Sequence, residues 1–218
     1  MKTFQIITEA DARVLEPGTS VALAPGGHVT PLAQDTLRAR RISVIRAGES
    51  EAGLEELAPT ADVRRIAIGS DHTGVALKRQ LATHLRGRGL SVLDLGTDRS
   101  EPVDYPDIAA DVASAVARGE ADAAIIIDGA GIGSAIAANK VDGIRAAMCT
   151  DQTIARYSRE HNGANALTLG STLLTFEEAR AIVDVWLATS MREPRYIRRL
   201  AKIRQIEQTR SPAGWKVR

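Results

Sequence analysis

The stretch Ile125-Ile126-Ile127-Asp128-Gly129-Ala130-Gly131-Ile132-Gly133-Ser134, followed by Ala135-Ile136-Ala137-Ala138-Asn139-Lys140, decides the fold class. Three β-branched residues before an acidic side chain are typical of a buried strand, and the alanines after the glycine-rich turn favour a helix. A strand, a glycine loop and a helix N-terminus form an anion site, because the loop amides and the helix dipole present positive ends. Asp128 stands at the mouth of this site, where we expect it to handle a proton.

Known phosphate-binding loops fit this stretch only in part. In the dinucleotide fingerprint G-x-G-x-x-G, Gly129 and Gly131 match, but Ser134 occupies the third glycine position. Asp151 could supply the acid that follows about 20 residues later, so a nicotinamide oxidoreductase stays open as an alternative. The Walker loop is excluded, because no Gly-Lys-Ser/Thr closes the turn. A further alternative is a tight strand-to-helix turn without a ligand, in which the glycines serve only to adopt positive φ.

Alternating β and α patterns surround this stretch from residue 63 onward. Strands are predicted at residues 66–69, 91–95, 123–127, 145–148 and 166–169, with helices at 75–88, 107–118, from 133, 152–159 and 176–187. Successive β-α-β steps predict an α/β fold with a Rossmann-like, doubly wound parallel sheet of about five strands. Ligands of such sheets bind beyond the carboxyl ends of the strands, where Ser70-Asp71-His72, Asp128, Asp151 and Gly170-Ser171 fall.

The sequence divides into a small extension at residues 1–48, a linker at 49–62 and a main domain at 63–218. In the extension, Thr8 with Asp11 resembles a helix cap, and Thr30-Pro31 begins a helix that runs to residue 40. Residues 21–23 and 42–45 are strand-like, and turns are expected at 17–18 and 25–27. The linker is acidic and contains Gly53 and Pro59.

Composition sets broad limits on function. The chain has 218 residues, 44% hydrophobic and 3% aromatic, which suits an α/β core of small aliphatic side chains. Its net charge of +1 argues against a nucleic-acid partner, although residues 192–218 alone carry nine basic and two acidic residues. Cys149 is the only cysteine, and no apolar run is long enough for a membrane span. A cytoplasmic protein without membrane contact is expected.

Four motifs together resemble the ribose-5-phosphate isomerase B and galactose-6-phosphate isomerase family. They are Ile68-Gly69-Ser70-Asp71-His72-Thr73-Gly74, Asp104-Tyr105-Pro106, the Gly129–Gly133 loop with Ala137-Ala138-Asn139-Lys140, and Ser158-Arg159-Glu160-His161-Asn162. The resemblance covers about residues 64–207. It implies an aldose–ketose isomerase of phosphosugars that needs no metal or cofactor and works as a homodimer or dimer of dimers, with sites at the subunit interface.

The resemblance also implies roles for single residues. His161, with Asn162 beside it, would assist ring opening, and Arg195 and Arg199 would bind the phosphate from one helix face. The remaining substrate-binding residues would be Asp71, His72, Tyr105, Gly129, Gly131, Gly133 and Ser134. The loop amides would then surround the enediolate oxygens. A basic, solvated helix face remains the plain alternative for the two arginines.

This chain departs from the family pattern at four positions. Asp128 replaces a cysteine that serves as the base in many members, and Ser134 stands where other members use a glutamate. Asp128 is therefore the only carboxylate at either base position, and we expect it to be the catalytic base. A structural loop acid is the alternative for Asp128. Thr172 and Ala130 replace, respectively, an arginine and a hydroxyl residue that are frequent in the family.

The extension resembles a different family. Ile7-Thr8-Glu9-Ala10-Asp11, Leu15-Glu16-Pro17-Gly18 and Val29-Thr30-Pro31-Leu32-Ala33 are similar to the N-terminal segment of cobalamin adenosyltransferases from ethanolamine-utilisation microcompartments. This resemblance implies an enzyme packaged in a bacterial microcompartment, with shell or cargo proteins as partners of residues 1–48. A small accessory subdomain is the alternative.

The combined prediction is the isomerisation of ribose 5-phosphate to ribulose 5-phosphate through an enediolate, with Asp128 and His161 as catalytic residues. Two alternatives remain open besides the oxidoreductase. One is an isomerase of another phosphosugar, such as a tetrulose or hexose phosphate. The other is a sugar-phosphate-binding module without catalysis.

Overall fold

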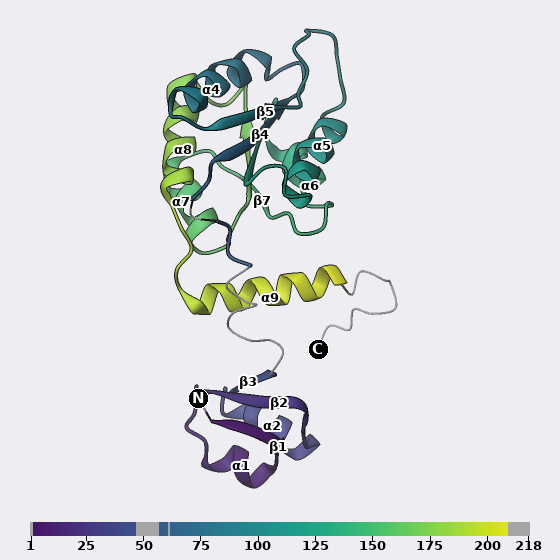
Figure 1. The fold of residues 1–218 in the computed structure, drawn as a ribbon, viewed down its shortest axis with the longest axis vertical. Coiled ribbons are helices and arrows are strands. Elements are labelled where there is room, and N and C mark those ends of the chain that lie inside the picture. Colours follow the sequence, from purple (N-terminus) through teal and green to yellow (C-terminus); the bar gives the residue numbers. More distant parts are fainter. Residues whose placement is uncertain (1, 47–56, 61, 209–218) are drawn as a thin grey trace. The chain divides into compact units, whose positions relative to one another are not determined.

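The computed structural model describes residues 2–46, 57–60 and 62–208, which belong to two compact units, Met1–Glu56 and Leu57–Arg218 (Figure 1). Most of the predicted linker at 49–62 lies outside the described residues. Within the part that the structure describes, no helix is long and apolar enough to cross a membrane.

The first unit is a small βαβαβ layer. Its elements are β1 (Thr3–Ile7), α1 (Glu9–Val14), β2 (Ser20–Val29), α2 (Pro31–Ala39) and β3 (Ser43–Arg46), and the strands pair in parallel in the order β1-β2-β3. The predicted caps are present: Thr8 and Asp11 form a capping box, and Thr30 caps α2 with Pro31 in its first turn. A core of its own holds Ile7, Ala12, Val21, Leu23, Ala33, Leu37 and Ile42.

The predicted turn at residues 25–27 is wrong, because β2 continues through it. The pairing of β2 with β1 shifts register between Phe4 and Ile6, as in a strand that carries a bulge. Gly26 takes φ +73°. A Cβ on Gly27 would lie 2.6 Å from the backbone oxygen of Gln5. The glycines therefore permit an irregular, closely packed strand and not a reversal of the chain. β1 itself was absent from the sequence prediction.

The second unit contains the predicted doubly wound sheet of five parallel strands. These are β4 (Arg65–Ser70), β5 (Ser91–Asp94), β6 (Ala123–Asp128), β7 (Ala146–Met148) and β8 (Ala166–Gly170), in the order β5-β4-β6-β8-β7. The connecting helices are α4 (Val75–Gly87), α5 (Tyr105–Ala117), α6 (Ile132–Ala138), α7 (Gln152–Glu160) and α8 (Phe176–Ala188). A final helix, α9 (Pro194–Gln208), follows them.

Alternate residues of the strands face two separate helical layers. Ile66, Ile68, Ile125 and Ile127 pack in one core with α4, α7 and α8, while Ala67, Ala124 and Ile126 pack in another with α5 and α6 (Figure 1). This two-sided burial explains why β6 is apolar along its whole length up to Asp128.

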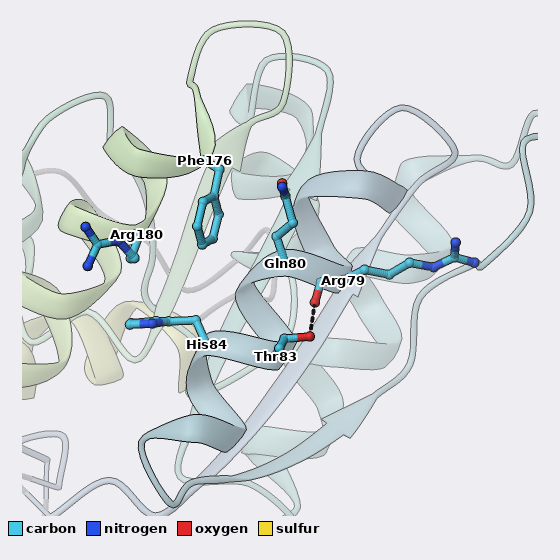
Figure 2. Close-up of a pocket in the computed structure, with 6 residues that line it drawn as sticks. All are labelled: Arg79, Gln80, Thr83, His84, Phe176 and Arg180. Atoms are coloured by element: carbon cyan, nitrogen blue, oxygen red, sulfur yellow. Dashed lines mark hydrogen bonds between the residues drawn. The ribbon is translucent and has the colours of Figure 1, made fainter.

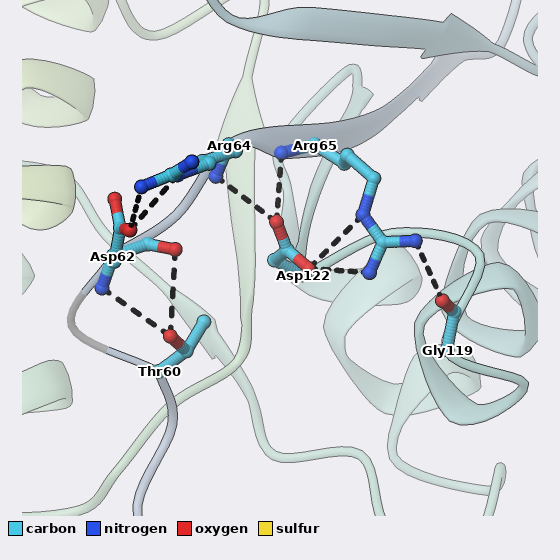
Figure 3. A network of polar contacts seen from close by, with 6 residues as sticks. All are labelled: Thr60, Asp62, Arg64, Arg65, Gly119 and Asp122. Carbon is cyan, nitrogen blue, oxygen red and sulfur yellow. Dashed lines mark hydrogen bonds and ion pairs between the residues drawn. The ribbon is translucent and has the colours of Figure 1, made fainter.

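Asp122 ties the beginnings of β4 and β6 together (Figure 3). Its Oδ2 accepts hydrogen bonds from the backbone amides of Arg64 and Arg65 at 3.0 and 2.8 Å. Its Oδ1 pairs with Nη2 of Arg65 at 2.6 Å, and Nη1 of Arg65 donates to the oxygen of Gly119 at 2.9 Å. Burial alone raises the pKa of Asp122, but the hydrogen bonds from Arg65 and the two amides outweigh it and the pKa is lowered.

Replacing Asp122 with Asn is expected to lower the free energy of unfolding by roughly 2 kcal/mol near neutral pH, because hydrogen bonds to a charged group are lost. Since the folded-state pKa is lowered, this stabilisation is complete above the unfolded pKa of about 4 and disappears as pH falls through the folded-state pKa. Urea unfolding at several pH values should show the wild type and Asp122→Asn converging in acid. Asp62→Asn is the control, because its ion pair with Arg64 is largely exposed and should contribute little at any pH.

Candidate active site

The carboxyl ends of β4 and β6 lie side by side where the order of the strands reverses. From β4 the chain passes through α4 to β5 on one side, and from β5 through α5 to β6 on the other. Such a switch point opens a crevice beyond the strand ends. Ser70 ends β4 and is followed by Asp71 and His72, and Asp128 ends β6 and is followed by the glycine loop. Asp71 and Asp128 therefore lie on neighbouring strands at the same edge.

The Asp128 carboxylate is held by the amides of its own loop. Its Oδ1 accepts hydrogen bonds from the amides of Ala130, at 2.8 Å, and of Gly131, and its Oδ2 accepts from Ser134 at 2.8 Å. The side chain is only 4% exposed. These bonds make Asp128 the acceptor for the N-terminus of α6. Three of the amides predicted to surround an enediolate are therefore directed at this carboxylate.

Two amides of the first turn of α6, those of Ile132 and Gly133, lie where a helix has no internal acceptor for its N–H groups. The ring of Tyr105 covers Gly133 so closely that a Cβ there would lie 2.6 Å from it. Gly131 takes φ +79°, and a Cβ on it would lie 2.9 Å from the backbone of Leu169. The loop glycines are thus required by close packing and backbone conformation as much as by any bound anion.

Hydroxyl residues after β8 hold the same loop from the other side. Thr172 donates from Oγ1 to the oxygen of Gly129 at 2.6 Å, and Ser171 donates from its amide to the oxygen of Asp128 at 2.8 Å. The hydroxyl of Ser171 lies 3.3 Å from that of Thr73, which itself donates to Oδ1 of Asp71 at 2.6 Å. A chain of hydroxyl contacts therefore links the ends of β4, β6 and β8.

His72 faces a cavity of about 560 Å³ beside this edge. Nδ1 of His72 accepts a hydrogen bond from the amide of Val103 at 3.3 Å, so the neutral ring carries its proton on Nε2. The cavity is lined by His72, Thr73, Val75, Ala76, Arg79, Asp98, Arg99, Ser100 and Glu101. The lining thus brings His72 and two arginines together with two carboxylates, and Arg79 already pairs with Asp98 at 3.6 Å.

The other predicted residues lie at the opposite, amino edge of the sheet. Arg159, near the end of α7, donates to the oxygens of Thr60 and Ala164, which precede β4 and β8. Leu200 of α9 packs against Gly163, a residue just before β8. These contacts place α9 across this end of the domain (Figure 1) and His161 at the beginnings of the strands. Burial, with the nearby charge of Arg145, lowers the pKa of Arg159 to about 10.

At the amino edge His161 belongs to an aromatic and basic group. Its ring centroid is 4.6 Å from that of Tyr157, nearly parallel to it, and 4.7 Å from that of Tyr196. The guanidinium groups of Arg195 and Arg199 lie over the Tyr196 ring. Asn162 lies at the same end of α7, where its side-chain amide donates to the oxygen of Tyr157 at 3.1 Å. We call Tyr157, His161, Asn162, Arg195, Tyr196 and Arg199 the amino-edge group.

The predicted site residues therefore form two sets within one chain. Asp71, His72, Tyr105, Gly129, Gly131, Gly133, Ser134 and Asp128 lie at the carboxyl edge, and His161, Asn162, Arg195 and Arg199 lie at the amino edge. Sequence reasoning did not include Tyr157 and Tyr196. Their spacing in the sequence could have indicated them, because Tyr157 is four residues before His161, one helical turn away, and Tyr196 is adjacent to Arg195.

A second cavity, of about 490 Å³, lies between α4 and α8 (Figure 2). It is lined by Arg79, Gln80, Thr83, His84, Phe176 and Arg180, none of which was predicted as a site residue. Nε2 of His84 lies 2.7 Å from Oδ1 of Asp184, and Arg180 pairs with Glu177 at 2.6 Å, so both side chains already have acidic partners. Among the residues that the structure describes, no group of three or more His, Cys, Asp or Glu side chains could hold a metal ion.

The fold defines a doubly wound α/β enzyme domain, and the crevice at its switch point is the candidate site. The chain belongs to the Ribose/Galactose Isomerase family, whose model matches residues 66–203. It is therefore an isomerase with an additional N-terminal unit outside the family match.

Relatives and solved structures agree with this assignment. The chain is 46% identical over 149 residues to ribose-5-phosphate isomerase B of Escherichia coli, across 68% of this chain and all of that protein. Ribose-5-phosphate isomerase B of Clostridium thermocellum superposes with a TM-score of 0.66 at 50% identity, across 67% of this chain and 99% of that one. The Mycoplasma genitalium enzyme, solved with bound ribulose 5-phosphate, gives 0.64 at 39% identity, across 66% and 96%.

Proposed function

We propose that this chain interconverts ribose 5-phosphate and ribulose 5-phosphate through a cis-enediolate. The observation that carries the proposal is the buried Asp128 carboxylate at the end of β6, one strand away from Asp71 and the His72 cavity. The identity to enzymes with this activity supports the substrate. Asp128 removes the proton from C2 and returns it to C1, as a positioned carboxylate base.

The amides of Ala130, Gly131 and Ser134 hold the Asp128 carboxylate in place for the proton transfer. The amides of Ile132 and Gly133 are the donors left to stabilise the enediolate. His161 acts on the ring oxygen, and Arg195 and Arg199 bind the phosphate.

This mechanism requires two copies of the chain, because Asp128 and His161 lie at opposite edges of one sheet. We propose a homodimer, or a dimer of dimers, in which the carboxyl edge of one subunit meets the amino-edge group of the other. Apolar residues near the loop support such an interface: Ile132 and Ile136, one turn apart on α6, are 55% and 58% exposed, and Leu173 is 55% exposed.

The test of the function is turnover without added metal or cofactor. Ribose 5-phosphate should be isomerised, whereas free ribose should be a very poor substrate, because it lacks the phosphate that anchors the sugar. A panel with tetrose and hexose phosphates addresses the alternative substrates. Thr172, which replaces an arginine that is frequent in the family, donates its hydroxyl to the oxygen of Gly129 and supplies no positive charge for a phosphate. The other phosphosugars therefore belong in the panel. Binding of phosphosugars without turnover would identify a non-catalytic module instead.

For the extension we propose attachment to a bacterial microcompartment, on the basis of its sequence resemblance and its separate core. Removing residues 1–56 is expected to leave kcat within about twofold, because relatives of about the length of the main domain are complete proteins. The same deletion should abolish co-purification with shell or cargo proteins of the host. If the deletion abolished turnover but left partner binding unchanged, the extension would be part of the active site.

A further inference from the structure

Tyr196 touches three of the side chains to which the proposed function gives a role. Its ring centroid is 4.7 Å from that of His161, and its hydroxyl accepts a hydrogen bond from Nη2 of Arg195 at 2.9 Å. The guanidinium carbons of Arg195 and Arg199 lie 4.7 and 5.3 Å from the ring centroid. One tyrosine therefore contacts the ring-opening residue and both phosphate ligands.

The packing of α9 holds this tyrosine while the arginines stay exposed. Ile197 and Leu200 are buried, and Leu200 packs against Gly163, two residues beyond His161. Tyr196 itself is half-buried, whereas Arg195 and Arg199 reach solvent. An exposed arginine samples many rotamers unless a neighbour restricts it. The Tyr196 ring and hydroxyl supply that restriction.

The electrostatics of this arrangement favour an anion. Two guanidinium groups beside one ring repel each other, and the negative face of the ring and the Glu193 carboxylate, 3.9 Å from Nε of Arg195, offset part of this repulsion. A phosphate dianion that bridges both groups would remove the remainder. Both guanidinium groups and the His161 imidazole therefore lie against the same Tyr196 ring.

We propose that Tyr196 is a positioning residue that fixes the phosphate-binding arginines and His161 relative to each other. The phosphate end of the sugar and its ring oxygen are then held by one preorganised group. The proposed role of Tyr157 is limited to His161, on which its ring stacks from α7 with 4.6 Å between the ring centroids. This inference rests on the proposed function.

The experiment separates the hydroxyl of Tyr196 from its ring by steady-state kinetics with ribose 5-phosphate. Tyr196→Phe keeps the ring but removes the acceptor for Arg195, so KM should rise about tenfold, as for Arg195→Ala, with kcat within about twofold. Tyr196→Leu removes the ring as well, so KM should rise further and kcat should fall by about tenfold. Tyr157→Leu should lower kcat while KM stays near the wild-type value.

Arg204→Ala provides the matched control, because Arg204 is an exposed arginine of α9 outside the amino-edge group. It should leave both constants unchanged. Wild-type constants for Tyr196→Phe and Tyr196→Leu, with unchanged melting temperatures, would overturn the inference. Identical effects of Tyr157→Leu and Tyr196→Leu on both constants would do so too, since that pattern indicates general loosening of the fold.

A titration with inorganic phosphate keeps this test independent of the proposed reaction. If the wild type turns over no phosphosugar, the proposed function fails, but the arginine pair can still be tested by calorimetry. Phosphate affinity that falls about tenfold in Tyr196→Phe would support the positioning role. Equal affinity in the wild type and Tyr196→Phe would refute it.

Discussion

Replacing Asp128 with Asn is expected to lower kcat by about 10²- to 10⁴-fold, because the amide cannot accept the substrate proton. KM should change little, since the phosphate is bound by other residues. The substitution also turns an NH₂ group toward the amide of Ala130 or of Ser134, so the free energy of unfolding should fall by about 1–3 kcal/mol. Both quantities have to be measured, because loss of the cap by itself could disturb the loop.

Asp151 offers a matched control for the structural part of this effect. It also follows a strand, and its Oδ1 caps α7 by accepting from the amides of Thr153 and Ile154 at 2.7 and 2.9 Å. Asp151→Asn should lower stability by less than about 1 kcal/mol, because Asn is nearly as good an N-cap residue as Asp, and leave kcat nearly unchanged. A kcat for Asp128→Asn as high as that of Asp151→Asn would show that Asp128 only caps α6 and is not the catalytic base. Asp128→Cys, which restores a group able to take up a proton, should retain measurable turnover.

Mixing two inactive variants, Asp128→Asn and His161→Ala, is expected to restore about a quarter of the wild-type activity. Random reassociation makes half of the dimers mixed, and one of the two sites in each mixed dimer contains both native residues. Each variant alone should be nearly inactive. Activity should be measured on the unfractionated mixture after joint refolding of differently tagged chains, and the mixed dimer purified by its two tags should show about half of the wild-type activity.

The pair Asp128→Asn and Asp71→Asn provides the control for this complementation. Both residues belong to the carboxyl edge, so every site of a mixed dimer would keep one defect and activity should not return. Recovery with this pair, or failure of the first pair to recover, would show that the site is not shared in the proposed way. A melting curve for each mixture excludes losses that come from unfolding.

The sequence predicted the elements of the main domain well, because its signals are local. Strands at 66–69, 123–127 and 166–169 were confirmed, since buried parallel strands appear as short runs of aliphatic residues. In the extension, the helix caps predicted at Thr8 and Thr30 were also confirmed. The turn predicted at 25–27 failed because glycine serves a bulged strand as well as a turn, and only the pairing with β1 decides between them.

The sequence by itself thus determined the α/β class, the five strands and the identity of the acidic and basic residues near their ends. Only the tertiary structure decided that β7 lies outside β8, that three loop amides bind Asp128, and that Tyr196 joins His161 to the arginines. It also placed Asp128 and His161 at opposite edges of the sheet. The physical reason is that periodicity and capping act over a few residues, whereas strand order, amide direction and side-chain contacts depend on segments far apart in the chain.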